Sequence, residues 1–277
     1  MPKSDTAPAP RQPALYIPHG GGPCFFMDPM PGMPSDLWGR MAAYLRGIPA
    51  SLPDVPRAVV VISAHWEAPR PTIGVAPSHA LLFDYYGFPE HTYRLRYPAR
   101  GAPALGARIR DLLAQAGIDA DADDRRGLDH GVFIPFKLIY PDAELPIVPL
   151  SLHRSLDPQF HFLLGSALAP LRDEGVLIVA SGMSYHNLRD FFQAGRGDDA
   201  AQAFDDWLAR TIADPDPQAR NRALLEWKQA PGARACHPRP EHWLPILVAA
   251  GAAASETAHR PYVDRLLGKP LCAVRFG

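Results

Sequence analysis

The stretch AVVVISAHWE, residues 58–67, decides the fold. It begins with an almost unbroken apolar run and turns polar near its end, where His65 is followed by Trp66 and Glu67. Short continuous apolar runs rich in β-branched residues are typical of strands buried on both faces of a parallel sheet. We therefore predict a strand over residues 58–63 that delivers His65 to the edge of a sheet.

Runs of the same character recur along the chain, at residues 14–17, 147–152 and 176–180. Apolar residues with helical spacing lie between them, over 37–45 after the expected N-cap Ser35 and over 105–113 before Gly117. Strands that alternate with helices predict an α/β fold, with a mostly parallel central sheet, helices on both faces and a metal site at the C-terminal edge of the strands.

The later part of the chain is more helical. Helices are expected over 201–213 and 219–227, which carry good helix formers, and over 241–250, an apolar segment that follows two prolines. Pro238 and Pro240 should hold the approach to the last helix extended and place His242 in its first turn. A terminal strand over 271–276 should return to the sheet or to an accessory antiparallel layer.

Size and composition favour one domain. The chain has 277 residues and 47% hydrophobic content, so residues 14–277 should form a single catalytic domain after a disordered tail over 1–13. The net charge of -1, without long charged runs, argues against nucleic-acid or acidic-membrane partners. Three cysteines without CxxC spacing, and no apolar run near the ~20 residues of a membrane span, favour a cytoplasmic protein.

Six histidines in five turn-like settings carry the chemistry. They are His19 before three glycines, His65, His130 between Asp129 and Gly131, His186 in the polar loop 181–187, and His237 and His242 in HPRPEH. Neutral imidazoles ligate metals and move protons near neutral pH. We therefore predict a mononuclear metal site gathered from distant parts of the chain.

Each setting also has a simpler interpretation. His19 alone is typical of any glycine-rich turn. Asp129 could raise the basicity of the adjacent His130, and a role as a helix cap is an equally good interpretation. Glu67 is either an acceptor that orients an imidazole or a solvated carboxylate. The five other histidines, His79, His91, His153, His161 and His259, are assigned to surface or loop positions. His153 is the exception, because it ends a predicted strand where it could meet a substrate carboxylate.

Taken together, these motifs resemble the class III extradiol ring-cleavage dioxygenases of the DOPA 4,5-dioxygenase type. The resemblance runs from about residue 14 to 276. Its most specific markers are HPRPEH at 237–242 and HGGGPCFF at 19–26. The ordered set of five histidine motifs is more specific than any single member.

The resemblance implies a non-haem Fe(II) that binds both oxygens of a catechol and O2, followed by cleavage of the ring beside the hydroxyls. His19, His65 and His242 would be metal ligands, and His186 would lie near or on the metal and transfer protons. His130 would contact substrate or act as acid or base, and His237 would line the substrate pocket. His153 is added as a substrate-binding residue from its place at the end of a predicted strand, independently of the resemblance. Relatives outside the subgroup use a glutamate as third ligand, which leaves Glu241 open. We favour His242 because the subgroup motif ends in histidine.

Two other functions fit the same histidines. Zn(II) also binds three histidines and activates water, so a zinc-dependent hydrolase is the main alternative, and zinc could occupy the purified protein. The second alternative is a protein that binds a metal or small molecule without catalysis. The histidines beyond the three needed as ligands argue against it, because a simple binding site does not need acid or base groups. The sequence does not indicate which catechol is cleaved, whether the 4,5 or 2,3 bond breaks, or the oligomeric state. Any of Arg94, Arg96, Arg234 and Arg239 could pair with an acidic substituent.

Overall fold

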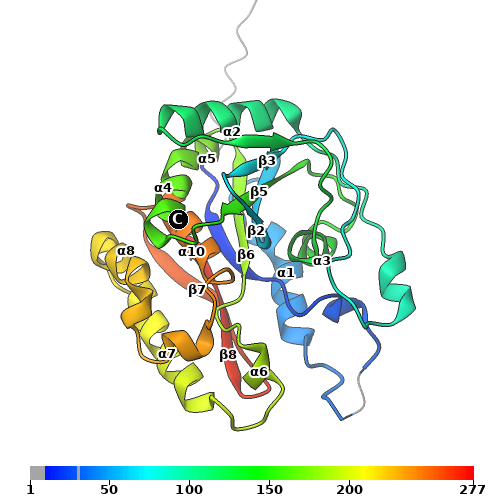
Figure 1. The fold of residues 1–277 in the computed structure, drawn as a ribbon, viewed down its shortest axis with the longest axis vertical. Coiled ribbons are helices and arrows are strands. Elements are labelled where there is room, and N and C mark those ends of the chain that lie inside the picture. Colours follow the sequence, from blue (N-terminus) through cyan, green and yellow to red (C-terminus); the bar gives the residue numbers. More distant parts are fainter. Residues whose placement is uncertain (1–9, 30–31) are drawn as a thin grey trace, which may run out of the picture.

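Eight strands form one sheet, in the order β4-β3-β5-β2-β6-β1-β8-β7. This arrangement comes from a computed structural model that describes residues 10–29 and 32–277 (Figure 1). The strands are β1 Ala14–Pro18, β2 Ala58–Ala68, β3 Thr72–Gly74, β4 Asp121–Asp123, β5 Ile147–His153, β6 Val176–Gly182, β7 Ala258–Leu266 and β8 Lys269–Phe276.

The centre of the sheet is parallel. Strand β2 pairs in parallel with β5 and β6, and β6 pairs in parallel with β1. These strands are almost fully buried because helices cover both faces, which explains their continuous apolar runs. All four predicted core strands are confirmed. The predicted terminal strand is confirmed as β8, which pairs antiparallel with β1 and β7.

Helices lie on both faces of the sheet, as predicted. Figure 1 shows α1 and α3 on one side and α4, α10 and α8 on the other. The helices are α1 Gly39–Ser51, α2 Pro103–Gln115, α3 His130–Ile139, α4 Pro158–Leu168, α5 Pro170–Asp173, α6 Leu188–Phe191, α7 Asp198–Ile212, α8 Pro217–Leu225, α9 Ala233–Cys236 and α10 Leu244–Ala252. Short 3-10 helices span Cys24–Phe26, Glu90–Arg94 and Trp227–Gln229.

Two helix starts differ from the prediction. Helix α1 begins at Gly39 with Trp38 as its N-cap, because the backbone forms a tight turn in which Gly39 N–H donates to Asp36 O at 2.7 Å. Ser35 is therefore not the cap. Helix α10 begins at Leu244 with a proline in its first turn. His242 consequently lies in the turn before the helix and not in its first turn.

Residues 11 and 12, just before β1, are anchored to the rest of the fold. Residues 1–9 of the expected tail lie outside the described residues. Gln12 is buried, and Arg11 pairs with Asp173 and Glu256. The three cysteines are buried and free, as their spacing predicts. Over residues 10–29 and 32–277, no helix has the length and apolar character needed to cross a membrane.

Candidate metal centre

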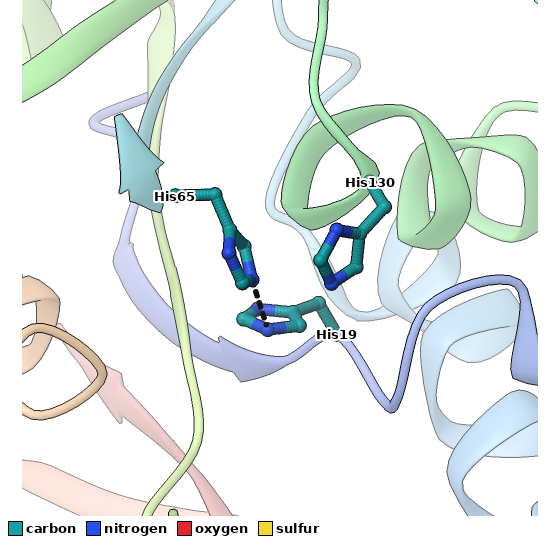
Figure 2. Close-up of side chains that lie close together, drawn as sticks. All are labelled: His19, His65 and His130. Carbon is teal, nitrogen blue, oxygen red and sulfur yellow. Dashed lines mark hydrogen bonds between the residues drawn. The ribbon is translucent and has the colours of Figure 1, made fainter. Parts of the chain in front are cut away.

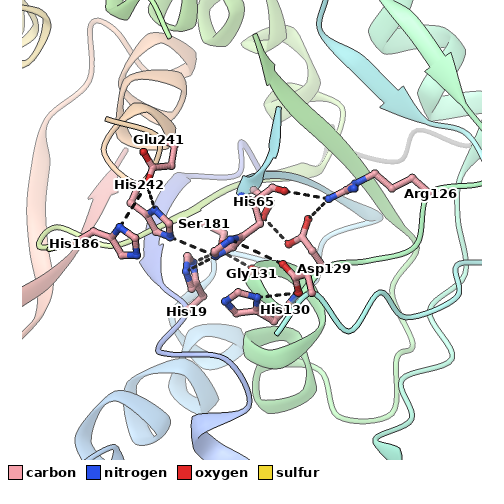
Figure 3. Close-up of polar contacts among 12 residues, drawn as sticks. His19, His65, Arg126, Asp129, His130, Gly131, Ser181, His186, Glu241 and His242 are labelled. Carbon is pink, nitrogen blue, oxygen red and sulfur yellow. Dashed lines mark hydrogen bonds and ion pairs between the residues drawn. The ribbon is translucent and has the colours of Figure 1, made fainter. Parts of the chain in front are cut away.

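The candidate site lies where β1, β2 and β6 end together. His19 directly follows β1, and His186 follows β6 within a few residues. The turn that carries His242 is fastened to the same edge, because its carbonyl accepts from Tyr16 Oη–H at 2.9 Å and from Met183 N–H at 3.2 Å. The parallel pairing thus gathers side chains from both ends of the chain (Figure 3).

His65 reaches the site through an irregularity in β2. The register between β2 and β5 shifts between Ile62 and Glu67, and His65 lies inside that shifted segment. A bulge of this kind re-aims a side chain beside a functional site. The strand extends beyond the predicted end at residue 63, so His65 sits within β2 and not after it.

Three imidazole nitrogens converge at metal-binding distances. His65 Nε2 lies 3.1 Å from His19 Nε2 and 3.3 Å from His242 Nε2 (Figures 2 and 3). Nitrogens bound at about 2.1 Å to one cation, with angles between 90° and 109°, would lie about 3.0–3.4 Å apart. The His65–His19 and His65–His242 pairs therefore each fit a shared cation. Two groupings of three have all their ligand atoms within 4.8 Å of one another, namely His19 with His65 and His130, and His186 with Glu241 and His242.

Hydrogen bonds determine which nitrogen of two histidines is free. The Ser181 hydroxyl donates to Gly131 O at 2.5 Å, so its oxygen accepts from His19 Nδ1–H at 2.9 Å. The Glu241 carboxylate accepts from His242 Nδ1–H at 3.0 Å. Because a neutral imidazole carries one proton, each Nε2 keeps its lone pair and turns it toward His65.

Burial keeps these imidazoles neutral. It lowers the pKa of His19 and His242 well below the ordinary value, and neighbouring histidines lower the pKa further. Burial and the nearby His130 lower the pKa of His65 to about 3. Neutral rings at neutral pH are what a metal requires of its histidine ligands.

His130 is the first residue of α3 and is held by a residue that sequence analysis missed. Asp84 accepts from the backbone N–H of His130 and from its Nδ1–H, both at 2.9 Å. Burial raises the pKa of Asp84, but the hydrogen bonds from His130 outweigh it and leave the pKa below its usual value. A lone aspartate in a loop has no distinguishing pattern in sequence. The neighbouring Asp129 instead accepts from Ser63 at 2.6 Å and from Arg126 at 3.1 Å, so its side chain ties the loop to β2.

His186 and Glu241 form the other side of the site. The His186 ring stacks on His242 with centroids 3.3 Å apart, and its Nδ1 lies 3.4 Å from Glu241 Oε1. Burial raises the pKa of Glu241, whereas His186 and Arg239 lower it, and the net pKa lies below the usual value. Arg239 also binds both oxygens of Glu67 at 2.6 Å. Glu67 therefore neither orients an imidazole nor stands free in solvent.

The structure places His237 and His153 away from the cluster. His237 is buried against Trp227 and Trp243, and its Nε2–H donates to Ser184 O at 3.0 Å. His153 packs on Phe160 at the end of β5, and its Nδ1 accepts from Ser155 N–H. Both lie outside the lining of the cavity described below, contrary to their expected substrate contacts. The prediction of surface or loop positions is wrong for His161, which is buried within α4. His79 does lie in a loop, although its side chain is buried.

A cavity of about 560 Å³ opens beside the cluster. His19, His65, His130, His186 and His242 all line it, together with the glycine loop 20–22 and many aromatic side chains. Gly20 and Gly22 have φ values of 80° and 53°, a left-handed conformation that glycine adopts without steric cost. The cluster can therefore reach a bound molecule directly.

The chain is similar to several known proteins over most of its length. The family model described as the catalytic LigB subunit of aromatic ring-opening dioxygenase matches residues 13–269. The chain is 38% identical to dioxygenase tasH of Hapsidospora irregularis, over 96% of this chain and 85% of that protein. It is 42% identical to 4,5-DOPA dioxygenase extradiol of Beta vulgaris, over 73% and 75%. A crystal structure of an uncharacterized protein from Escherichia coli K12 has a TM-score of 0.77 at 31% identity, covering 96% and 100%.

Proposed function

The chain belongs to the LigB family of extradiol aromatic ring-opening dioxygenases, and on that premise we propose that it uses one non-haem Fe(II) to cleave a catechol with O2. We propose His19, His65 and His242 as the ligands. The observation that carries this proposal is the approach of their three Nε2 atoms, at 3.1 Å and 3.3 Å across His65. The proposed role is breakdown of aromatic compounds.

The donor set suits an oxygenase. Three protein ligands leave coordination positions for a catechol and dioxygen, and a bound ferrous ion supplies Lewis acidity that lowers the pKa of a coordinated hydroxyl. His242 is favoured over Glu241 as third ligand because Glu241 engages the Nδ1 atoms of His242 and His186 and also Arg239. The carboxylate thereby orients imidazoles instead of facing His65.

His186 and His130 are proposed to move protons. Both rings line the cavity, and each has a carboxylate at its Nδ1, Glu241 for His186 and Asp84 for His130. When such a ring accepts a proton from a catechol hydroxyl, the carboxylate stabilises the imidazolium until the proton returns to product. The stacking of His186 on His242 keeps that proton acceptor beside the proposed ligands.

Anaerobic reconstitution tests the proposed activity. Protein loaded with Fe(II) under nitrogen should consume oxygen and form a yellow ring-opened product when a catechol and air are added. Protein loaded with Zn(II) is the control and should bind metal without consuming oxygen. Hydrolysis of esters or amides by the zinc form, with no oxygen uptake by the iron form, would overturn the proposal in favour of a hydrolase.

Substitutions separate ligands from proton carriers. His186→Ala and His130→Ala should retain iron and lose turnover by about 10²- to 10⁴-fold, the usual contribution of a general acid or base. His242→Ala should lose iron. His153→Ala should keep both iron and activity, because its ring packs on Phe160 outside the cavity. Iron content and oxygen uptake, measured on the same variants, distinguish a metal ligand from a proton carrier. Full activity in His186→Ala or His130→Ala would contradict the assignment of that residue as a proton carrier.

A further inference from the structure

We propose that the catechol cleaved here carries a bulky, uncharged, apolar substituent that fills the cavity and reaches its mouth at α6. This inference rests on the proposed function and adds the substrate class. The cavity of about 560 Å³ lies within the range of about 300–1,000 Å³ that is typical of pockets for drug-sized ligands. It is therefore larger than a single dihydroxylated ring needs.

The inner wall of the cavity is aromatic. Phe25 packs edge-on against Trp38 with centroids 6.2 Å apart, and Tyr85 packs edge-on against Phe88 at 5.4 Å. All four side chains line the cavity. Such rings contribute large apolar area and contact a hydrocarbon substituent without needing a polar partner from it.

The mouth of the cavity is also apolar. Leu188 on α6 and the adjoining Phe192 line the cavity, yet they are 64% and 58% exposed. Apolar side chains that stand together in water beside a pocket mark a surface that a ligand covers. A substituent that extends from the histidine cluster to this rim would remove both side chains from water, which the hydrophobic effect favours.

The charges at the rim do not select an anionic substituent. Among the described residues that line the cavity, the charged side chains other than histidine are Asp28, Asp36 and Arg46. All three are exposed, so their fields are screened by solvent. Two acids and one base offer a carboxylate no net attraction. Of the arginines proposed from sequence to bind an acidic substituent, Arg239 is paired with Glu67 and Arg94 with Glu90.

A series of substituted catechols tests the inference with the Fe(II)-loaded enzyme. The value of kcat/KM, followed by oxygen uptake, should rise from catechol through 4-methyl- and 4-propyl- to 4-hexylcatechol. Each fully buried methylene contributes up to about fourfold. We expect a total rise of at least about tenfold from the methyl to the hexyl compound. L-DOPA should be cleaved less efficiently than 4-propylcatechol, because its charged groups would lose water against apolar walls.

Binding provides a readout that does not depend on turnover. Without oxygen, 4-hexylcatechol should quench tryptophan fluorescence through Trp38 and bind at least about tenfold more tightly than 4-methylcatechol. Leu188→Ser should weaken 4-hexylcatechol binding and reduce the hexyl-to-methyl ratio of kcat/KM about fivefold. The matched control is Leu163→Ser, a comparably exposed leucine on α4 outside the cavity, and it should leave the ratio unchanged.

The outcomes distinguish the two proposals. A flat series, or L-DOPA as the best substrate, overturns the substrate class while the proposed function stands. Equal ratios in Leu188→Ser and Leu163→Ser also overturn the assignment of α6 as the rim that contacts substrate. If no catechol in the series causes oxygen uptake, the proposed function fails, and the substrate class fails with it.

Discussion

Ser181 shows how one buried hydroxyl can orient a metal site. It has a single proton, which it donates to Gly131 O, and its oxygen is thereby left to accept from His19 Nδ1–H. The same side chain thus connects β6 with the first turn of α3 and with the residue that follows β1. Partners of this kind hold the ring of a metal-binding histidine in one orientation and one tautomer.

Replacing Ser181 by alanine should weaken metal binding about 10- to 100-fold, because His19 would lose the acceptor that holds its ring. Anaerobic titration with Fe(II) measures the change. Ser184→Ala is the matched control, since that buried hydroxyl accepts from Cys272 N–H at 2.9 Å and not from an imidazole. The control should lower stability and leave metal affinity unchanged. Equal affinities of wild type and Ser181→Ala would refute this role.

His161 makes stability depend on pH. Burial in α4 lowers its pKa to about 4, although its Nδ1–H donates to Asp157 O at 2.6 Å. The unfolded chain takes up a proton near pH 6.5, whereas the folded chain does so near pH 4. The stabilisation is therefore present above pH 6.5 and is lost progressively as the pH falls toward 4.

Between about pH 7 and pH 5, His161 should account for a loss of about 2 kcal/mol in the free energy of unfolding. Urea denaturation of wild type and His161→Gln at the two pH values isolates this contribution. The variant should be less stable at pH 7, because His153 N–H loses its acceptor His161 Nε2, but its stability should decline less toward pH 5. Parallel declines in both proteins would show that His161 does not carry the effect.

At the scale of elements, the first turn of α3 packs tightly against the end of β2. A Cβ atom added at Gly131 would lie 2.6 Å from Ser63 Oγ and 2.9 Å from His65 Cδ2. Both atoms belong to the shifted segment of β2, so the absence of a side chain at residue 131 allows the helix to approach. The positions of His130 and His65 are coupled through this contact.

Gly131→Ala should push His65 aside and reduce kcat/KM about 10²-fold, the order of loss expected when a catalytic geometry shifts by about 1 Å. Gly47→Ala on α1 is the control, because a Cβ atom there meets nothing within 4 Å. It should stabilise the protein by roughly 0.4–1 kcal/mol and leave the rate unchanged. Oxygen uptake and thermal unfolding measure the two effects. A fully active Gly131→Ala protein would show that the contact relaxes without moving His65.

Strands were predictable from the sequence where both of their faces are buried. Strands β1, β2, β5 and β6 are buried on both faces, so their apolar runs stand out in the sequence. Strand β7 was missed because its residues, AHRPYVDRL, form neither a continuous apolar run nor a strict alternation, and Pro261 lies among them. Strands β3 and β4 were missed because three residues are too few to show a pattern.

The site histidines next to strand ends and turns were predictable because their positions follow from the predicted strands. His19, His65, His130, His186 and His242 all line the cavity, since the parallel topology carries strand ends to one edge. His237 shares a motif with His242 but is buried among tryptophans, because spacing does not tell which way a side chain points. Asp84 and Ser181 are single polar residues whose roles arise only from tertiary contacts.

At the scale of the whole molecule, the proposed ligands join the two ends of the chain. His19 follows β1, and His242 precedes α10, so a shared cation would cross-link segments far apart in sequence. A ligand that binds only the folded chain stabilises it by about 2.7 kcal/mol at one hundred times its dissociation constant.

Saturating Fe(II) should therefore raise the unfolding midpoint by roughly 5 °C under anaerobic conditions. His242→Ala should abolish the shift, and His153→Ala should retain it, because the His153 ring packs on Phe160 away from the cluster. Differential scanning calorimetry with and without metal gives the measurement. An equal shift in His242→Ala would assign the third ligand elsewhere, with His130 the nearest candidate by geometry.

The place of β1 in the sheet has a consequence for synthesis. Strand β1 is made first, yet it lies between β6 and β8, which begin at Val176 and Lys269. At about 5–20 residues per second, a nascent chain carries this apolar strand unpaired for on the order of ten seconds or more. We expect the emerging polypeptide to be a chaperone client during that interval. A cation shared by the proposed ligands His19 and His242 would bind only after residue 242 has left the ribosome.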